Sequence, residues 1–203
     1  MKKVLFILFV LVSFSGFAQA EKDSLVKVDK DAILDKLELM FYLDQEATKC
    51  LTMTKEKQTE LDKTFPYYFM NTIVKNNPST LDLREFIGFD FKEFKPIKCK
   101  DFYVAVYEKN LVEFIDMTKK YGYLSTQRLK RYKDGKAYSP LIFVIHNSYS
   151  DKEVKKLMKQ EFKIGNIDQK EYDQFKFFLE RKKELTYDDV ARFEKIGGKI
   201  LKS

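Results

Sequence analysis

The chain has few of the residues that metal sites and sheet turns require. Its 203 residues include one histidine, two cysteines, seven glycines and four prolines. One histidine and two cysteines do not make a zinc site of recognised spacing, so we expect no metal and no cofactor. An all-β fold needs more turn residues and clean period-two alternation. The sequence also lacks a nucleophile elbow, a phosphate-binding loop and a metal-binding helix motif.

Neither sign of charge dominates the chain. It has 38 Lys and Arg residues against 31 Asp and Glu, with the two signs interspersed throughout. Nucleic-acid-binding proteins concentrate positive charge on one face or arm, whereas alternating Lys and Glu is typical of solvated helices. We therefore expect no nucleic-acid partner.

Only the N-terminus carries a long apolar run. Lys2 and Lys3 precede nine apolar residues (4–12), and small residues then lead to Ala18-Gln19-Ala20. This order predicts a signal peptide over 1–20, cut after Ala18 or Ala20. Nine residues rise only ~14 Å as a helix, about half of a bilayer core. We expect a periplasmic or secreted protein with no transmembrane segment after cleavage, and a single α-helical domain over 21–203.

An exported chain enters an oxidising compartment, where Cys50 and Cys99 could form a disulfide. A disulfide between them would close a loop of about fifty residues and stabilise the fold by ~4 kcal/mol in the chain-entropy model. Two buried free thiols are the alternative, and the spacing does not decide between them.

The mature chain is predicted to be mainly α: a single-domain bundle of about six to eight helices, with a short extended segment near 88–100. Apolar spacings of three and four indicate a helix over 30–53. Its stripe consists of Ile33, Leu37, Met40, Ala47 and Leu51, with Leu34 and Phe41 beside it. Three further helices are expected over 64–76 (starting at Pro66), over 81–87 (capped by Ser79 or Thr80) and over 101–121 (ended by Gly122).

The last third of the chain carries the clearest helix signals. Ser125 is expected to cap a short basic helix, and the segment 141–146 is a buried helix or strand. A capping box opens the first of three more helices and similar start patterns open the other two, and each is followed by an apolar stripe. These patterns are Ser150-x-x-Glu153, Asp168-x-x-Glu171 and Thr186-x-x-Asp189.

Three polar residues interrupt otherwise apolar surfaces. Asp44 lies in the stripe of the first helix, Asn110 in that of helix 101–121, and His146 ends the most apolar segment. Convergence of the three would give a catalytic site with His146 as base, Asp44 orienting it and Asn110 positioning substrate. The alternative is that each is a hydrogen-bonded structural residue.

Three short motifs resemble a bacterial family of helical domains of unknown function that occurs in exported proteins. They are Leu39-Met40 with Asp44-Gln45, Asn110 with Tyr121-Gly122-Tyr123, and Ile145-His146 with Gly165-Asn166-Ile167 and Tyr172. The resemblance covers roughly residues 37–180 and implies a helical fold without a known reaction. A basic residue of the family pattern is replaced by Thr48, and an acidic–basic pair by Phe177 and Phe178. These departures favour binding over catalysis.

These observations predict an exported helical domain that acts as a non-catalytic binding or interaction module, with a protein or a small ligand as its partner. An extracytoplasmic hydrolase-like enzyme using His146, Asp44 and Asn110 is the first alternative. A periplasmic immunity-type protein is the second, although the strongly charged face expected of one is not evident.

Overall fold

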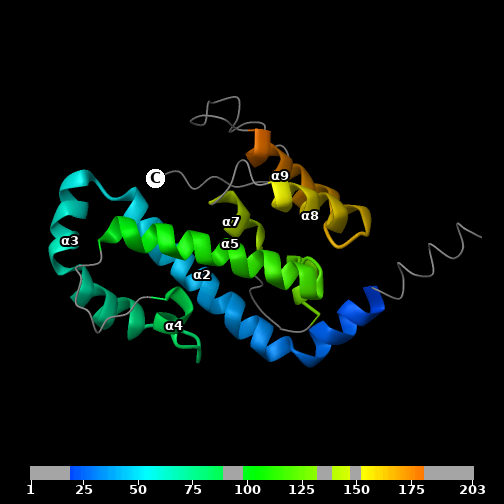
Figure 1. Ribbon diagram of the computed structural model, residues 1–203, viewed down its shortest axis with the longest axis horizontal. Coiled ribbons are helices and arrows are strands. Elements are labelled where there is room, and N and C mark those ends of the chain that lie inside the picture. Colours follow the sequence, from blue (N-terminus) through cyan, green and yellow to red (C-terminus); the bar gives the residue numbers. More distant parts are fainter. Residues whose placement is uncertain (1–18, 89–97, 132–138, 147–151, 181–203) are drawn as a thin grey trace, which may run out of the picture. The chain divides into compact units, whose positions relative to one another are not determined.

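A computed structural model of the protein describes residues 19–88, 98–131, 139–146 and 152–180 (Figure 1). Within these ranges the chain is helical and contains no strand, which confirms the predicted mainly α bundle. No helix in the described part is both long and apolar enough to cross a membrane. The predicted signal peptide lies almost wholly outside these ranges, as do most of the segment 88–100, Ser150 and the predicted helix after Thr186.

The chain packs as two compact units, and helix α5 belongs to both. One unit is Lys30–Phe114; the other combines the N-terminal residues up to Asp29 with Ile115–Ser203. We call them the central unit and the terminal unit, and describe each by itself.

Helices α2 (Lys30–Thr52) and α5 (Cys99–Tyr121) form the centre of the central unit. They run antiparallel there. Lys36 pairs with Glu113 at one end, and Cys50 is bonded to Cys99 at the other. The core between them and the neighbouring helices is built from buried apolar residues, among them Leu39, Leu43, Phe65, Phe69, Phe102 and Val106.

The stripe predicted on α2 is largely confirmed, with one error. Ile33, Leu37, Met40 and Ala47 are buried, but Leu51 is 52% exposed. Leu39 and Leu43 are buried as well, because the apolar face of α2 is broader than a stripe of one residue per turn.

The predicted start of the next helix at Pro66 is wrong. Helix α3 covers Lys55–Tyr68, begins after the N-cap Thr54, and contains Pro66 in its last turn. A π-helical segment, Phe69–Val74, follows directly. Proline removes one backbone donor from a helix interior, and the wider π turn comes where the regular hydrogen-bond pattern is interrupted.

Helix α4 (Leu83–Ile87) ends at Gly88 as predicted, but its cap was misassigned. Asp82 is the N-cap, and its side chain accepts a hydrogen bond from the Arg84 amide. The expected caps Ser79 and Thr80 instead donate their hydroxyls to Asp35 on α2, at 2.8 and 2.7 Å. The Ser79 hydroxyl still accepts the Leu81 amide at 3.0 Å, but neither hydroxyl caps α4, because both donate to Asp35.

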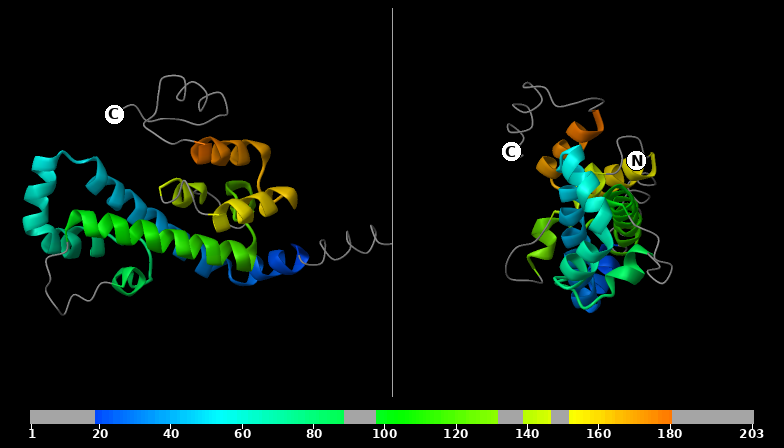
Figure 2. Two further views of the ribbon diagram at one scale, coloured as in Figure 1. Left: turned by 45° about the horizontal axis from the view of Figure 1, so that its top comes forward. Right: turned by 90° about the vertical axis from the view of Figure 1, so that its left-hand side faces the viewer.

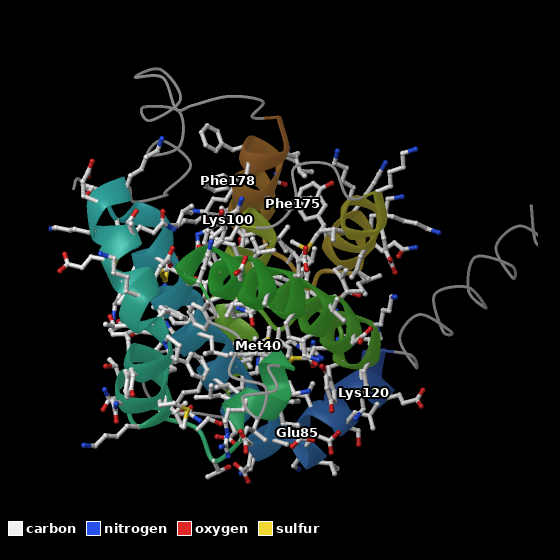
Figure 3. The ribbon with its side chains drawn as sticks, turned by 60° about the vertical axis from the view of Figure 1, so that its left-hand side comes forward. Met40, Glu85, Lys100, Lys120, Phe175 and Phe178 are labelled. Carbon is white, nitrogen blue, oxygen red and sulfur yellow. A yellow bond between two sulfur atoms is a disulfide. The ribbon has the colours of Figure 1, made fainter. Side chains whose placement is uncertain are left out.

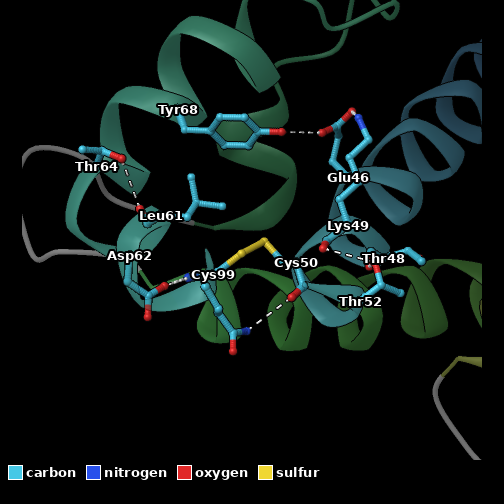
Figure 4. The surroundings of a disulfide bond; sticks show 11 residues. Glu46, Thr48, Lys49, Cys50, Thr52, Leu61, Asp62, Thr64, Tyr68 and Cys99 are labelled. Carbon is cyan, nitrogen blue, oxygen red and sulfur yellow. Dashed lines mark hydrogen bonds and ion pairs between the residues drawn. A yellow bond between two sulfur atoms is a disulfide. The ribbon is translucent and has the colours of Figure 1, made fainter. Parts of the chain in front are cut away.

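The disulfide between Cys50 and Cys99 is present, which settles the alternative left open by the sequence (Figure 4). It joins the last turn of α2 to the first residue of α5. Beside it, the Cys99 amide donates to Asp62 Oδ1 of α3 at 2.7 Å, which satisfies one of the free donors at the start of α5.

The terminal unit consists of short helices around the end of α5. It contains a helix over residues 19–28, α6 (Thr126–Leu129), α7 (Leu141–Ile145), α8 (Lys152–Lys163) and α9 (Gln169–Glu180). Helices α8 and α9 form a hairpin and lie side by side in both views of Figure 2. The segment predicted as a buried helix or strand is a helix, α7, with His146 as its C-cap. Ser125 caps α6 through its hydroxyl, as predicted.

Side chains also tie the N-terminal segment to the end of α5. Asp29 accepts hydrogen bonds from Lys120 at 3.0 Å and from the Tyr121 hydroxyl at 2.7 Å (Lys120 is labelled in Figure 3). On α9, Phe175 and Phe177 are buried, while Phe178 is half-buried and packs edge-on against Phe177.

Candidate functional site

The turn that ends α5 is the base of the candidate site. Gly122 has φ +74°, a conformation that favours glycine. A Cβ at this position would lie 2.7 Å from Asn166 Nδ2, 3.1 Å from Arg128 Nη1 and 3.2 Å from Glu161 Oε2. Glycine is required here for its conformation and for the close approach of these three polar side chains.

Glu161 is a carboxylate buried within α8, only 3% exposed. Its Oε2 accepts the Tyr123 amide at 2.7 Å and Asn166 Nδ2 at 2.6 Å, and Lys22 Nζ lies 3.5 Å from Oε1. A buried carboxylate is costly unless its oxygens are bonded. These contacts meet that cost and fix the turn after α5 against α8.

Arg128, on α6, holds the same turn after α5 through hydrogen bonds to its carbonyls. Its Nη1 donates to the carbonyls of Tyr121 at 2.7 Å and Tyr123 at 3.2 Å. Its Nε and Nη2 both donate to Asp23 Oδ1, at 3.1 and 2.5 Å. The guanidinium is 6% exposed and the carboxylate 41%. Arg128 therefore joins helix 19–28, the turn after α5 and α6 through one planar group.

A polar cleft of about 250 Å³ lies over this framework. Helix 19–28, α6 and the turn between α8 and α9 provide its sides. Ile164 is the one large apolar residue among those that line it, and none of them is aromatic. The lining residues are Gln19, Asp23, Ser125, Gln127, Arg128, Arg131, Ile164, Gly165, Asn166 and Asp168.

A carboxyl group with altered acidity, that of Glu171, lies one turn beyond the cleft on α9. Asp168 Oδ1 accepts the Glu171 amide at 2.7 Å, so the predicted N-terminal cap of α9 is confirmed. The Glu171 side chain does not complete a capping box, however; Oε1 accepts from the Ser139 hydroxyl at 3.3 Å. Burial, reinforced by the Asp168 carboxylate, raises the pKa of Glu171 to about 7.

The predicted site residues Asp44 and Asn110 both lie in the central unit, on facing helices. Asp44 is 1% exposed, and Gln45 Nε2 lies 3.4 Å from its Oδ2. Asn110 is fully buried and donates to the Met40 carbonyl at 3.0 Å. Its Oδ1 accepts no hydrogen bond from the described residues.

Tyr107 and Thr48 complete this polar layer between α2 and α5. Their hydroxyls lie 3.1 Å apart, and Thr48 also donates to the Asp44 carbonyl at 2.8 Å. Burial raises the pKa of the Tyr107 phenol, and the Asp44 carboxylate raises it further. Thr48, which stands where the family pattern has a basic residue, is therefore part of a half-buried hydroxyl network.

His146 lies in the terminal unit. It follows the last residue of α7, where its backbone amide donates to the Ile142 carbonyl at 3.1 Å. The side chain is half-buried rather than enclosed in the core. The predicted catalytic group of Asp44, Asn110 and His146 is thus divided between the two units, and its convergence stays a prediction.

Sequence reasoning missed the residues that build the cleft, although one signal was present. Glu161 follows Val154, Leu157 and Met158 at helical spacing, so an acid interrupts that stripe as Asp44 interrupts the first. Gly122 was predicted as the end of helix 101–121 and, like Asn166, as part of the resemblance motifs, but neither was predicted to belong to a site. Nothing in the sequence distinguishes Arg128 from the other cations of a basic segment.

Comparisons of the chain with protein-family models, with curated proteins and with solved structures found no match. The resemblance of the three motifs to a family of helical domains therefore stays a prediction. Within the described ranges, no group of three or more His, Cys, Asp or Glu side chains is arranged to hold a metal ion.

Proposed function

We propose that the protein is an exported, non-catalytic binding module whose ligand site is the polar cleft of the terminal unit. The observation that carries the proposal is the combination of a concave polar surface with a fixed base. Arg128 and Glu161 are buried and bonded to the turn after α5 and to neighbouring side chains, while Arg131, Gln127 and Asp168 are exposed along the cleft. A preorganised site of this kind loses little conformational entropy on binding.

Two features support an extracytoplasmic location. The Cys50–Cys99 disulfide suits an oxidising compartment. The N-terminal residues 1–20 have the order of a signal peptide. Neither feature identifies a partner, and both are consistent with the periplasmic or secreted location predicted from the sequence.

Chemical-shift mapping tests the assignment of the cleft. A library of small polar compounds would be titrated into the isotope-labelled protein, following backbone amide signals. We expect the largest shifts at Gln127, Arg131 and Asn166, and loss of those shifts in an Arg131→Gln variant. Shifts that gather in the central unit, or that persist unchanged in the variant, contradict the proposal.

The buried layer between α2 and α5 supports a second candidate, the hydrolase-like enzyme. Asn110 Oδ1 accepts no bond from the described residues, and Asp44 is held in the same helix interface. Under this alternative His146→Ala abolishes turnover with the fold intact. Under a structural role the substitution lowers the free energy of unfolding, by about 1–3 kcal/mol if a buried partner is left unpaired.

A further inference from the structure

The unused hydrogen-bonding atoms of the cleft carry both signs of charge. Asp23 Oδ1 is fully used: it accepts from Gln19 Nε2 and twice from Arg128. Its Oδ2 accepts no hydrogen bond from the described part of the chain, although the carboxylate is 41% exposed. Asp168 is similar, with Oδ1 committed to the Glu171 amide and the side chain exposed.

Arg131 supplies the opposite charge. It lines the cleft, is exposed, and makes no ion pair with any residue of the described ranges. Arg128 cannot take this role, because its Nε and Nη2 groups donate to Asp23 and its Nη1 group donates to the carbonyls of Tyr121 and Tyr123. The cleft therefore presents two carboxylate oxygens and one guanidinium to a ligand.

A ligand with a single charge would match only part of this arrangement. An anion bound to Arg131 is repelled by the carboxylates of Asp23 and Asp168. A cation bound to either carboxylate is repelled by the Arg131 guanidinium. The lining has no aromatic ring on which a sugar or a nucleobase could stack. A volume of about 250 Å³ corresponds to roughly eight liquid water molecules, the size of a molecule with a similar number of non-hydrogen atoms.

We propose, on the basis of the binding function assigned above, that the cleft takes a small zwitterion such as a free amino acid or a dipeptide. Its ammonium group is held by Asp23 Oδ2 and Asp168, and its carboxylate by Arg131. Charge-assisted hydrogen bonds are about twice as strong as neutral ones. The three side chains come from different elements: Asp23 from helix 19–28, Arg131 from the segment just after α6, and Asp168 from the N-cap of α9.

Calorimetric titration of the purified protein tests the ligand class. Glycine, glycylglycine and triglycine carry both charges at increasing separation. Acetate and methylamine carry one charge each, and glucose and inorganic phosphate represent other ligand classes. We expect at least one zwitterion to bind roughly tenfold more tightly than either singly charged probe. Zwitterions that bind no better than acetate or methylamine overturn the inference.

Matched variants locate the binding. Asp168→Asn removes the charge and retains a good N-cap, and Arg131→Gln removes the guanidinium from an exposed position. Each should weaken zwitterion binding by roughly tenfold. Lys130→Gln, which changes an exposed neighbour outside the lining, should leave it unchanged. Equal effects of all three variants contradict the assignment.

The remaining probes separate this inference from the broader proposal. If glucose or phosphate binds in a manner sensitive to Arg131→Gln while no zwitterion binds, the cleft is a binding site and the zwitterion assignment is wrong. If no probe binds at millimolar concentration, both the zwitterion inference and the small-ligand function of the cleft fail.

Discussion

At the scale of single residues, Gly122 shows how one missing side chain allows three polar groups to meet. Asn166, Arg128 and Glu161 all approach the position where a Cβ would stand, at 3.2 Å or less. Two of these side chains are donors and one is an acceptor. The close approach places the Glu161 carboxylate on the Tyr123 amide and the Arg128 guanidinium on the neighbouring carbonyls.

We expect Gly122→Ala to lower the free energy of unfolding by roughly 2–4 kcal/mol, because the left-handed conformation and the crowding both oppose a methyl group. Gly165 is the matched control in the same unit. It has φ +83° with nothing within 4 Å of an added Cβ, so Gly165→Ala should cost only about 1 kcal/mol. Chemical denaturation measures both, and equal losses would mean that the crowding at Gly122 is relieved without cost.

The raised pKa of Glu171 links stability to pH. Its carboxyl has a pKa of about 7 in the folded protein against an ordinary value of 4.5. The folded state thus binds the proton more tightly. The free energy of unfolding therefore falls as the pH rises from about 4.5 through 7, and levels off above it. After allowance for the partial exposure of the side chain, the loss is on the order of 1–2 kcal/mol.

Glu171→Gln should remove this part of the pH dependence, because the amide mimics the protonated carboxyl. Unfolding free energies at pH 5 and pH 8 should differ less in the variant than in the parent. Glu60→Gln on α3, where the side chain is exposed, serves as the control. A pH dependence identical in parent and Glu171→Gln would assign the titration to another group.

At the scale of helices, the sequence predicted those elements whose ends depend on local chemistry. The C-terminal glycine of α5 and the serine cap of α6 are set by neighbouring residues, and both were predicted correctly. The errors arose where a distant residue intervened, as when Asp35 recruited Ser79 and Thr80. Pro66 was read as a first-turn residue because the sequence gives no sign of a π segment that accommodates it later in a helix.

The candidate site follows the same pattern. Asp44 and Asn110 could be recognised because a polar residue in an apolar stripe is visible in the sequence, and both are indeed buried. The cleft depends on contacts between residues as distant as Asp23 and Arg128, or Tyr123 and Glu161. Sequence spacing does not reveal such pairs.

The disulfide ties helix α2 to helix α5 across a separation of 49 residues. Replacement of Cys50 and Cys99 together by alanine should lower the free energy of unfolding by about 4 kcal/mol in the chain-entropy model. Denaturation of the oxidised protein and of the double variant measures the difference. Intact masses that are the same before and after reduction would show that the purified protein lacks the bond.

At the scale of the whole molecule, the two compact units share α5, which passes from one to the other without interruption. The central unit has a disulfide and an aromatic core that includes Phe65, Phe69 and Phe102. The terminal unit has a buried apolar core of its own, which includes Phe143, Met158 and Phe175, and it also buries the charged groups of Arg128 and Glu161. Removal of a partner of Arg128 or Glu161 should destabilise the terminal unit, because it leaves a buried charge unpaired.

The predicted export of the chain concerns the whole molecule, because it removes the N-terminal residues. We expect the protein recovered from outside the cytoplasm of the producing cell to begin at Gln19 or Glu21, as N-terminal sequencing or intact mass would report. Replacement of Ala18 and Ala20 by larger residues should block processing, because the cleavage site requires small side chains. Recovery of the chain with residues 1–18 intact and in the cytoplasm contradicts the prediction.

Gln19 lies at the start of helix 19–28, where its amide bonds to both Asp23 and Asn166 at 3.2 Å. The two candidate cleavage points lie on either side of the Gln19–Ala20 pair. A cut after Ala18 keeps this amide at the edge of the cleft, whereas a cut after Ala20 discards it and leaves a new α-ammonium group on Glu21, two residues from Asp23. If residues 1–20 are a signal peptide, as predicted, the two cuts would give mature forms with differently shaped and differently charged clefts, and the position of the cut would alter which ligand the proposed site prefers.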